Sequence, residues 1–192
     1  MIDKKTLRVE LRKSRNLFEK NHFFWPSNLE DLPAPLHRMI GAARVVAGYA
    51  KAGSEVDATC LIALAAGLGR TTALPWLSDR IAPLVFREWA PGEALEAAPF
   101  GFRQPLATAQ RCTPDLIFTP LLGFDRTMNR LGQGAGHYDR AFASNPDSLR
   151  IGLAWSVQEC PDLSTDPWDV PLDAVLTEKE WITGAQSRIK PR

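Results

Sequence analysis

Residues 114–140, PDLIFTPLLGFDRTMNRLGQGAGHYDR, combine a strongly apolar run with a loop in which three glycines alternate with other residues. The apolar run at 116–119 predicts a buried strand, and the segment 137–145 has the spacing of a helix. The glycine loop therefore joins a strand to a helix. In α/β proteins this junction is where ligands are commonly held.

Strands and helices alternate along the rest of the chain as well. Leucines spaced among basic residues predict a first helix from Asp3 to about Lys20, which Asp3 would cap. We also predict strands at 43–50, 71–77, 82–90, 150–156 and 173–182, a helix at 52–69 with Ser54 as its N-cap, a short helix and a turn at 92–105, and a Pro-rich loop near 21–35. This alternation predicts an α/β fold with a central, mostly parallel sheet flanked by helices in a Rossmann-like three-layer arrangement. At 192 residues, the chain (1–192) is expected to form one domain.

The composition is that of a globular protein with an ordinary core, since 45% of the residues are hydrophobic and 23% are charged. A formal net charge of +1 favours neither a nucleic-acid partner nor an anionic membrane. Cys60, Cys112 and Cys160 form no CxxC pair, which argues against a structural zinc site and a disulfide framework. The N-terminus is too charged for a signal peptide, and the apolar run 58–69 is too short to cross a bilayer. We therefore expect a cytoplasmic protein, and we expect it to be a monomer.

The glycine loop has the composition of an anion-binding site. Gly132, Gly134 and Gly136 allow positive φ and a close approach of a ligand, so that successive N–H groups can form a nest for phosphate. Arg130 and Arg140 could add charge-assisted hydrogen bonds, and the dipole of the following helix would favour an anion. The alternative is a tight turn without a ligand, because the loop matches neither of the two common nucleotide fingerprints.

Two side chains after the loop extend this chemistry. Tyr138 offers a ring that could stack on a flat ligand and a hydroxyl group that could bond to it. Asp139 supplies a hard oxygen ligand of the kind that Mg²⁺ prefers. Together with the loop, they would suit a phosphorylated ligand and its metal ion, and the alternative of a plain turn stays open.

Four blocks of the sequence resemble the 5-formyltetrahydrofolate cyclo-ligase (5,10-methenyltetrahydrofolate synthetase) family, in the order in which that family carries them. Residues 120–140 resemble its FD…RLGxGxGYYD signature, which is the specific match. Residues 4–8 (KKTLR) resemble its opening Lys-xxx-Arg element, 54–75 its E-x-x-T…P segment, and 166–178 (DPWDVPLDAVLTE) its closing HD…D…T segment. Together the blocks span nearly the whole chain.

The resemblance implies an enzyme that uses ATP and Mg²⁺ to convert 5-formyltetrahydrofolate into 5,10-methenyltetrahydrofolate, with release of ADP and phosphate. ATP would phosphorylate the formyl oxygen, N10 would attack the activated carbon, and phosphate would leave. Catalysis would consist mainly of positioning and of stabilising charge around the phosphates. The partner would be a small-molecule substrate, a reduced folate.

The same resemblance implies which residues form the site. ATP would be bound by Lys4, Arg8, Arg130, Leu131, Gly132, Gln133, Gly134, Ala135, Gly136, His137 and Tyr138. Among them, Arg130 and Tyr138 would act in catalysis. Lys4 and Arg8 share one helical face because they lie four residues apart. The residue types alone also allow a plain solvated basic helix at this place.

Further residues are implied for the folate and the metal ion. Glu55, His137 and Tyr138 would contact the folate, and the Glu55 carboxylate would accept hydrogen bonds from N–H groups of the aminopyrimidine ring. Asp139 and Asp169 would hold Mg²⁺, directly or through water. Without the resemblance, Glu55 could equally be an acid that stabilises the first turn of a helix, and Asp169 a turn residue in a Pro-rich loop.

The chain departs from the family pattern at a few positions. Gln104 stands where glutamate is expected, Ala135 where glycine or lysine is common, His137 at the first tyrosine of the YY pair, and Trp168 at a histidine. These changes leave the phosphate arginines and metal aspartates in place. They raise the alternative of a non-catalytic protein that binds ATP or a reduced folate on the same fold. A third possibility is an unrelated sheet protein with a sugar-phosphate site.

Overall fold

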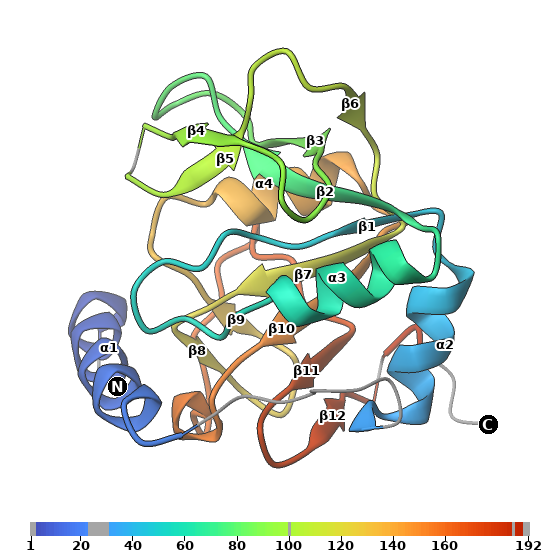
Figure 1. The fold of residues 1–192 in the computed structure, drawn as a ribbon. Coiled ribbons are helices and arrows are strands. Elements are labelled where there is room, and N and C mark those ends of the chain that lie inside the picture. Colours follow the sequence, from blue (N-terminus) through green and yellow to red (C-terminus); the bar gives the residue numbers. More distant parts are fainter. Residues whose placement is uncertain (1–2, 23–30, 100, 186, 190–192) are drawn as a thin grey trace.

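The centre of the structure is a mixed β-sheet. The computed structural model describes residues 3–22, 31–99, 101–185 and 187–189. The strands of the main sheet are β1 (Val45–Ala47), β2 (Thr71–Trp76), β3 (Val85–Glu88), β6 (Arg111–Cys112), β7 (Leu116–Pro120), β10 (Leu149–Leu153), β11 (Ala174–Leu176) and β12 (Trp181–Thr183). Their order across the sheet is β12-β11-β10-β7-β1-β2-β3-β6 (Figure 1). The pairs from β11 to β2 are parallel, and antiparallel strands extend both edges. The predicted α/β fold with a mostly parallel sheet is confirmed.

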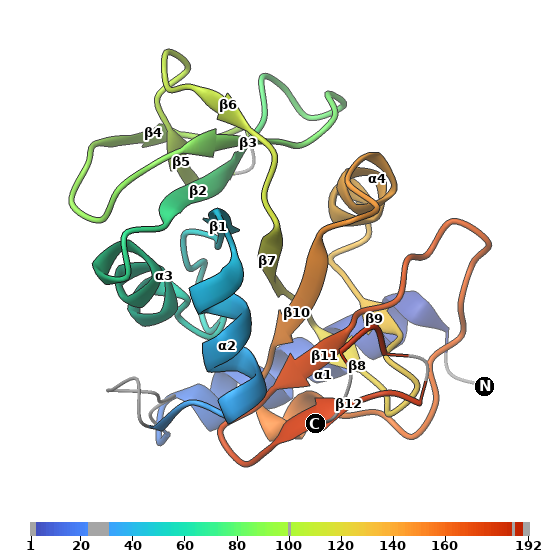
Figure 2. The ribbon, with the colours of Figure 1, turned by 90° about the vertical axis from the view of Figure 1, so that its right-hand side faces the viewer.

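Helices cover both faces of this sheet. The helices that the structure describes are α1 (Lys4–Glu19), α2 (Ala34–Ala42), α3 (Thr59–Gly67) and α4 (His137–Ser144). Figure 2 shows the sheet nearly edge-on, with α2 and α3 on one side and α4 on the other. Among these helices, none combines the length and the apolar composition that crossing a lipid bilayer would take.

The strand β7 shows why the sheet is buried on both sides. Leu116 and Phe118 pack into the apolar cluster beneath α2 and α3, whereas Ile117 packs with Phe142 of α4. Successive side chains of a strand point to opposite faces, so a strand that is covered on both faces must be apolar throughout. This explains the continuous apolar run at 116–119, and the predicted three-layer arrangement is confirmed.

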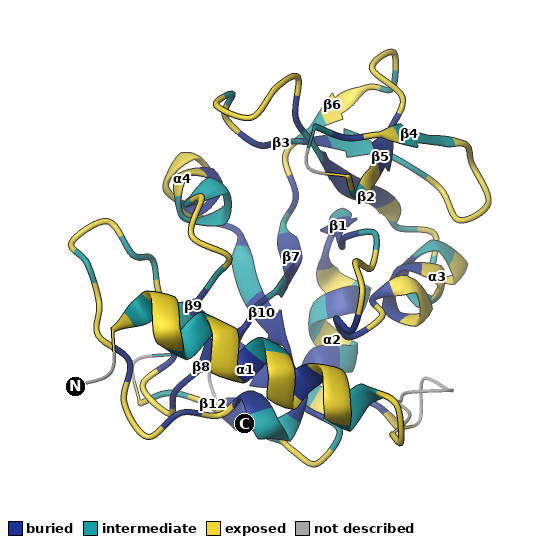
Figure 3. Ribbon diagram, turned by 90° about the vertical axis from the view of Figure 1, so that its left-hand side faces the viewer, coloured by how far each residue is buried: buried dark blue, intermediate teal, exposed yellow. Residues whose placement is uncertain are grey.

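The helix α1 lies beside the segments that leave the carboxyl ends of β7 and β10. It begins after Asp3, whose carboxylate accepts hydrogen bonds from the N–H groups of Lys5 and Thr6, so the predicted cap is confirmed. The helix packs against the short 3-10 helix η2 (Ser156–Gln158) and buries Leu11. Figure 3 shows its outer face exposed to solvent. The inner face packs against the segments that follow these strands.

Two β-hairpins stand outside the main sheet. Their strands are β4 (Leu95–Ala97) with β5 (Arg103–Pro105), and β8 (Gly123–Phe124) with β9 (Arg130–Leu131). The short helix predicted at 92–105 is therefore wrong, whereas the turn predicted in the same segment is present, since Gly101 N donates to Ala98 O between the two strands. Gly92 and Gly101 have φ of 96° and 80°, which a helix cannot accommodate. The Glu96 carboxylate on β4 also accepts a hydrogen bond from Gln104 on β5 at 3.1 Å, a contact that the hairpin creates.

The helix α2 was not predicted. Residues 23–30 of the predicted Pro-rich loop lie outside the described residues, and the end of that loop at Ala34 already begins α2. Proline is tolerated in the first turn of a helix, where its missing N–H group would have no partner. Leu36 and Ile40 lie one turn apart and are fully buried, so the apolar spacing of a helix was present.

The start of α3 and the last strand also differ from the prediction. The helix α3 begins at Thr59, and Ser54 is not its N-cap. The Ser54 hydroxyl instead accepts a hydrogen bond from Arg15 Nε at 3.0 Å, a long-range contact that spacing along the chain cannot reveal. The predicted strand at 173–182 is two antiparallel strands, β11 and β12, because the chain turns at residues 177–180.

Asp125 fixes the turn between β8 and β9. Only 1% of this residue is exposed, and its carboxylate accepts hydrogen bonds from the backbone and side chains of Thr127 and Asn129, at 2.7–3.0 Å. It also accepts a bond from the Leu163 N–H group at 3.0 Å, which ties the segment leading to residue 169 to this hairpin. Burial alone would raise the pKa of Asp125, but these hydrogen bonds outweigh it and lower the pKa.

We expect Asp125→Asn to lower the free energy of unfolding by about 3 kcal/mol, because an amide would turn an N–H₂ group toward donors. The loss should be full above the ordinary Asp pKa of 3.8 and should shrink as the pH falls through the lowered pKa, where the wild-type carboxylate is also protonated. Denaturant unfolding at several pH values measures it. Asp79→Asn is the control, since Asp79 accepts backbone bonds on the surface, and a loss as large there would contradict the expectation.

Candidate active site

A cavity of about 670 Å³ opens where the parallel strands end, a size typical of small-molecule sites. Its wall comes from the segments that follow β1, β2 and β7, from the first turns of α1, and from the glycine loop with the start of α4. All residues predicted for the site lie on this wall: Lys4, Arg8, Glu55, the run 130–139 and Asp169. The fold thus brings together side chains as much as 165 positions apart. The roles of these residues remain predictions.

The glycine loop has the backbone of an anion-binding turn. Gly134 and Gly136 have φ of 105° and 63°. Gly136 is the N-cap of α4, and no side chain in the described part of the chain caps this helix. The first N–H groups of α4 therefore lack side-chain acceptors and carry the positive end of the helix dipole. A phosphate group could bind to them.

Two arginines hold this loop through its carbonyl oxygens. Arg8 Nε donates to Gly132 O at 2.9 Å, and Arg140 Nη1 donates to Ala135 O at 3.0 Å. A Cβ atom on Gly134 would lie 3.4 Å from Arg8 Cζ, so the guanidinium group packs directly against the loop. The contacts occupy the loop carbonyls and bring positive charge beside the N–H groups.

Arg130 and Asp139 form an ion pair at the other end of the loop. Arg130 Nη2 lies 2.9 Å from Asp139 Oδ2, and only 5% and 14% of their side chains are exposed. The Arg130 guanidinium also lies near the rings of Tyr138 and Phe142, at 5.5 Å and 5.6 Å from their centroids. Arg130 is therefore held rigidly, and a metal ion at Asp139 would have to share the carboxylate with it.

Lys4 joins α1 to the loop at residues 166–169. Its Nζ atom lies 2.6 Å from Asp166 Oδ2 and 3.1 Å from Asp169 Oδ2. Burial alone would lower the pKa of Lys4, but the two carboxylates outweigh it and raise the pKa, so the amine is charged. Lys4 and Asp169 thus bind each other, and either must exchange this partner in order to bind a ligand.

The carboxylates on the wall do not form a ready-made metal cage. No group of three or more His, Cys, Asp or Glu side chains within the described ranges could hold a metal ion. Asp139 and Asp169 nevertheless offer one carboxylate each to the same cavity. Mg²⁺ commonly takes one or two carboxylates and completes its coordination with water and phosphate oxygens. These residues therefore fit a metal ion that arrives with a phosphorylated ligand.

Tyr138 and His137 present polar groups beside the loop. The Tyr138 hydroxyl is buried and has no hydrogen-bond partner among the described residues, and burial raises the pKa of Tyr138, so it remains a neutral donor. His137 Nδ1 lies 3.0 Å from Arg140 Nη2. Burial and the Arg140 charge lower the pKa of His137 below its ordinary 6.5, so the imidazole is neutral at pH 7.

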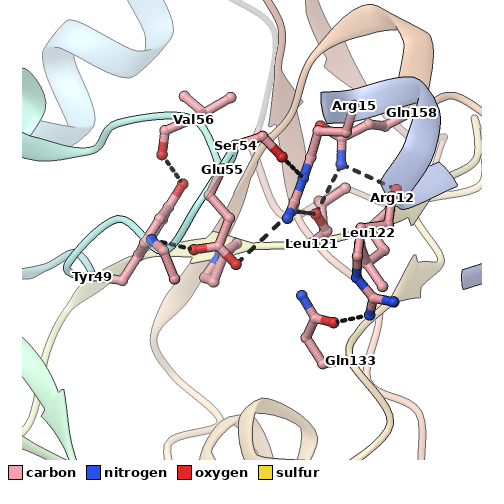
Figure 4. Close-up of polar contacts among 12 residues, drawn as sticks. Arg12, Arg15, Tyr49, Ser54, Glu55, Val56, Leu121, Leu122, Gln133 and Gln158 are labelled. Carbon is pink, nitrogen blue, oxygen red and sulfur yellow. Dashed lines mark hydrogen bonds and ion pairs between the residues drawn. The ribbon is translucent and has the colours of Figure 1, made fainter. Parts of the chain in front are cut away.

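Glu55 lies in the loop before α3. Because α3 begins at Thr59, the alternative role of Glu55 as a first-turn helix acid is wrong. Glu55 is 8% exposed, its Oε2 atom accepts a hydrogen bond from Ala52 N at 3.1 Å, and its Oε1 atom lies 3.9 Å from Arg15 Nη1 (Figure 4). Burial raises the pKa of Glu55, and the Arg15 charge opposes this rise.

The departures at Gln104 and Trp168 differ in their consequences. Gln104 is 2% exposed, accepts a hydrogen bond from Leu77 N at 3.0 Å and donates to Leu77 O at 3.2 Å and Glu96 at 3.1 Å. An ionised glutamate could not donate these bonds, so glutamine suits its place behind the cavity wall. Trp168 is 69% exposed and lies on the cavity wall itself.

Sequence reasoning missed other residues around the cavity. Asp166 was not predicted, and nothing near it in the sequence distinguishes it from the surrounding acids. Arg15 was not predicted either, although it follows Lys4 and Arg8 at spacings that keep all three on one helical face. The apolar part of the wall, with Leu77 and Phe102, comes from separate segments that only the fold brings together.

Comparison with known proteins identifies the family. The sequence model of the 5-formyltetrahydrofolate cyclo-ligase family matches residues 1–178. This chain belongs to the 5-formyltetrahydrofolate cyclo-ligase family. The resemblance predicted from the sequence is confirmed, the chain is a member of a family of enzymes, and the possibility of an unrelated sheet protein is wrong.

Comparisons with individual cyclo-ligases and with a solved structure support the same family. The chain is 33% identical over 150 residues to the 5-formyltetrahydrofolate cyclo-ligase of Mycolicibacterium smegmatis, covering 73% of this chain and 77% of that protein. It is 37% identical over 99 residues to that of Haemophilus influenzae, covering 48% of this chain, and it spans about half (53%) of the length of that relative. The NMR structure of Aquifex aeolicus 5,10-methenyltetrahydrofolate synthetase superposes with a TM-score of 0.68 at 26% identity, covering 97% of both chains.

We expect Gly134→Ala to weaken ADP binding at least about tenfold, because a side chain at φ of 105° is strained by about 1–3 kcal/mol and the loop would leave this conformation; the new Cβ would lie in contact with Arg8. Calorimetric titration with ADP measures this. Gly92→Ala is the matched control, since Gly92 has φ of 96°, lies off the cavity wall and would have no atom within 4 Å of a new Cβ. Equal ADP affinity in both variants would contradict an anion site in the loop.

Proposed function

We propose that this protein catalyses the ATP- and Mg²⁺-dependent conversion of 5-formyltetrahydrofolate into 5,10-methenyltetrahydrofolate, with release of ADP and phosphate. Membership of the cyclo-ligase family supports the folate reaction. The observation that carries the nucleotide requirement is the glycine loop at 132–136, whose N–H groups and adjoining arginines share a cavity with Glu55. One cavity thus offers loop N–H groups and arginines to a phosphate group, and the Glu55 carboxylate to a second ligand.

At the cationic end, the loop and the start of α4 would bind the phosphates of ATP. Arg8 already lies against the loop, and Lys4 would turn from its two aspartates to the phosphates. Asp139 and Asp169, which both line this cavity, would hold Mg²⁺ directly or through water. When bound, Mg²⁺ would neutralise charge on the phosphate oxygens and help to align the terminal phosphate.

At the other end, the reduced folate would lie between Glu55 and the apolar wall. The Glu55 carboxylate would accept hydrogen bonds from the N–H groups of the aminopyrimidine ring, and Leu77 and Phe102 would cover the rest of the flat ligand. Tyr138 and His137 line the same cavity directly after the glycine loop, and Tyr138 is near enough to Glu55 for an electrostatic interaction. They would contact both ligands. The unpartnered Tyr138 hydroxyl supports a polar contact at this junction.

The proposed reaction has two steps. The formyl oxygen attacks the terminal phosphorus of ATP, and the bond from that phosphorus to the bridging oxygen breaks, so that ADP leaves. N10 then attacks the formyl carbon, N10 loses its proton, and the carbon–oxygen bond breaks as phosphate departs. Arg130, fixed by Asp139 and nearly buried, would stabilise the negative charge of the transferring phosphoryl group.

We also propose that residues 1–192 form one domain and that the protein works as a monomer in the cytoplasm. The packing of α1 against segments next to the central strands supports one domain. The thiols of Cys60, Cys112 and Cys160 are all free, as a reducing compartment would keep them.

The proposed activity is tested with the purified protein, 5-formyltetrahydrofolate, ATP and Mg²⁺. We expect the near-ultraviolet absorbance of the methenyl product to appear, and to disappear when ATP is omitted or Mg²⁺ is chelated. Product formation without ATP would refute the proposed mechanism. Binding of ATP or the folate by calorimetry without any turnover would instead support a non-catalytic binding protein.

We expect Asp139→Asn to raise the Mg²⁺ concentration for half-maximal activity by about tenfold or more, because it removes a carboxylate ligand. Activity as a function of Mg²⁺ at fixed ATP measures this. Asp166→Asn is the matched control: Asp166 is a cation-bound carboxylate on the same wall that we do not assign to Mg²⁺. An unchanged Mg²⁺ dependence in the Asp139 variant would show that this metal role is wrong.

A further inference from the structure

Arg15 is a buried arginine next to the cavity. It lies on the inner face of α1, is 4% exposed, and does not contribute to the cavity wall. A guanidinium group cannot lose its proton in a protein, so its charge must be balanced where it lies. The nearest carboxylate that balances it is Glu55.

Hydrogen bonds from different segments hold Arg15 in place. Its Nε atom donates to Ser54 Oγ at 3.0 Å, and its Nη1 atom donates to Leu121 O at 3.2 Å (Figure 4). The Ser54 hydroxyl donates in turn to Asn16 Oδ1, and Gln158 Nε2 donates to the same Leu121 oxygen at 2.8 Å. The guanidinium is thereby fixed between α1, the loop before α3 and the segment after β7.

The distance from Arg15 to Glu55 allows an ion pair without a direct hydrogen bond. At 3.9 Å, Nη1 and Glu55 Oε1 are within ion-pair distance but too far apart for a hydrogen bond. The other carboxylate oxygen accepts a bond from Ala52 N at 3.1 Å, and the Gln133 side chain on the cavity wall also hydrogen-bonds to Glu55. A carboxylate has about four lone pairs, so Glu55 has its charge balanced while about two of them remain available. Glu55 lies on the cavity wall and Arg15 does not, so a ligand would meet the carboxylate and not the guanidinium.

We propose that Arg15 is a positioning residue for the reduced-folate substrate, whose fixed charge keeps the buried Glu55 carboxylate ionised and directed at the aminopyrimidine N–H groups. The inference rests on the proposed function, in which Glu55 contacts the folate. A protonated Glu55 would place an O–H donor against ring donors, whereas the carboxylate accepts from two of them at once.

The surroundings of Glu55 support this dependence on Arg15. The charged and titratable groups that face Glu55 are Arg15 on α1, Lys51 and Tyr49 from the segment after β1, and Tyr138 on α4. Burial raises the pKa of both tyrosines, which remain neutral. Lys51 is bound to another carboxylate on α1 at 2.7 Å. Removing Arg15 would therefore raise the pKa of Glu55 further.

The test is Arg15→Gln, with the KM for 5-formyltetrahydrofolate and for ATP measured from about pH 5.5 to about pH 9. We expect the folate KM to approach the wild-type value at high pH and to rise by about tenfold for each pH unit below the raised Glu55 pKa. The ATP KM should follow the wild type throughout. A folate KM that rises equally at every pH would overturn the inference.

Thermal unfolding of the same variant separates this role from a merely structural one. Without Arg15, ionised Glu55 is a buried charge without its main counter-charge, so the stability of the variant relative to the wild type should fall as the pH rises from 4.5 to the raised pKa. Folate binding should improve over the same interval. A structural role predicts that binding and stability decline together, and that outcome would also overturn the inference.

Further variants cover the case in which Arg15→Gln does not fold. The double variant Arg15→Gln with Glu55→Gln buries no charge, and its folate KM should equal that of Glu55→Gln alone at every pH. A folate KM that is higher in the double variant than in Glu55→Gln would overturn the inference.

Arg15→Lys keeps the charge, so its folate KM should follow the wild-type pH profile. A folate KM that rises at low pH in this variant would equally count against the inference. If the wild type itself does not turn over the folate, the proposed function fails instead.

Discussion

The carboxylates that line the cavity are each held against a cation, and this pairing organises the whole site. Asp139 is bound to Arg130, Asp166 and Asp169 share Lys4, and Glu55 faces Arg15. A charge removed from water is costly unless an opposite charge lies beside it, so these pairs fix the first helix and the 166–169 loop around the ends of the central strands. A polyanionic ligand would enter a site whose positive groups are already in place and would bind by exchange of partners.

The sequence was informative where function depends on local chemistry. The cap at Asp3, the start of α4 after the glycine loop and the buried strand at 116–119 all follow from short-range preferences, and the structure has them. It was less informative where a distant partner decides. Residues 92–105 have the composition of a helix but form a hairpin in which Gln104 donates a hydrogen bond to Glu96. Ser54 was predicted to cap a helix, but its hydroxyl accepts a hydrogen bond from Arg15. Neither contact has a signature along the chain.

The same distinction applies to the site. Each predicted residue belongs to a block that resembles the family, so the blocks located the cavity wall even though residues far apart form it. Arg15 and Asp166 were missed because each acts on a neighbour, Glu55 or Lys4, and their importance appears only once the neighbour is placed. Gln104 is the opposite case. Its departure from the family pattern suggested a change in the site, but its side chain is hydrogen-bonded to the backbone of Leu77 behind the cavity wall.

The position of α1 links ligand affinity to the dynamics of the chain. This helix stands outside the sheet and contributes Lys4 and Arg8 to the cavity, where Arg8 is hydrogen-bonded to the glycine loop. A ligand that touched both the helix and the loop would bind only when the helix is docked, so part of its binding free energy would stabilise the docked state. Such a ligand would hold α1 in its docked position, so the amide hydrogens of α1 would exchange with solvent more slowly in its presence. A change that weakened the docking of α1 would speed product release.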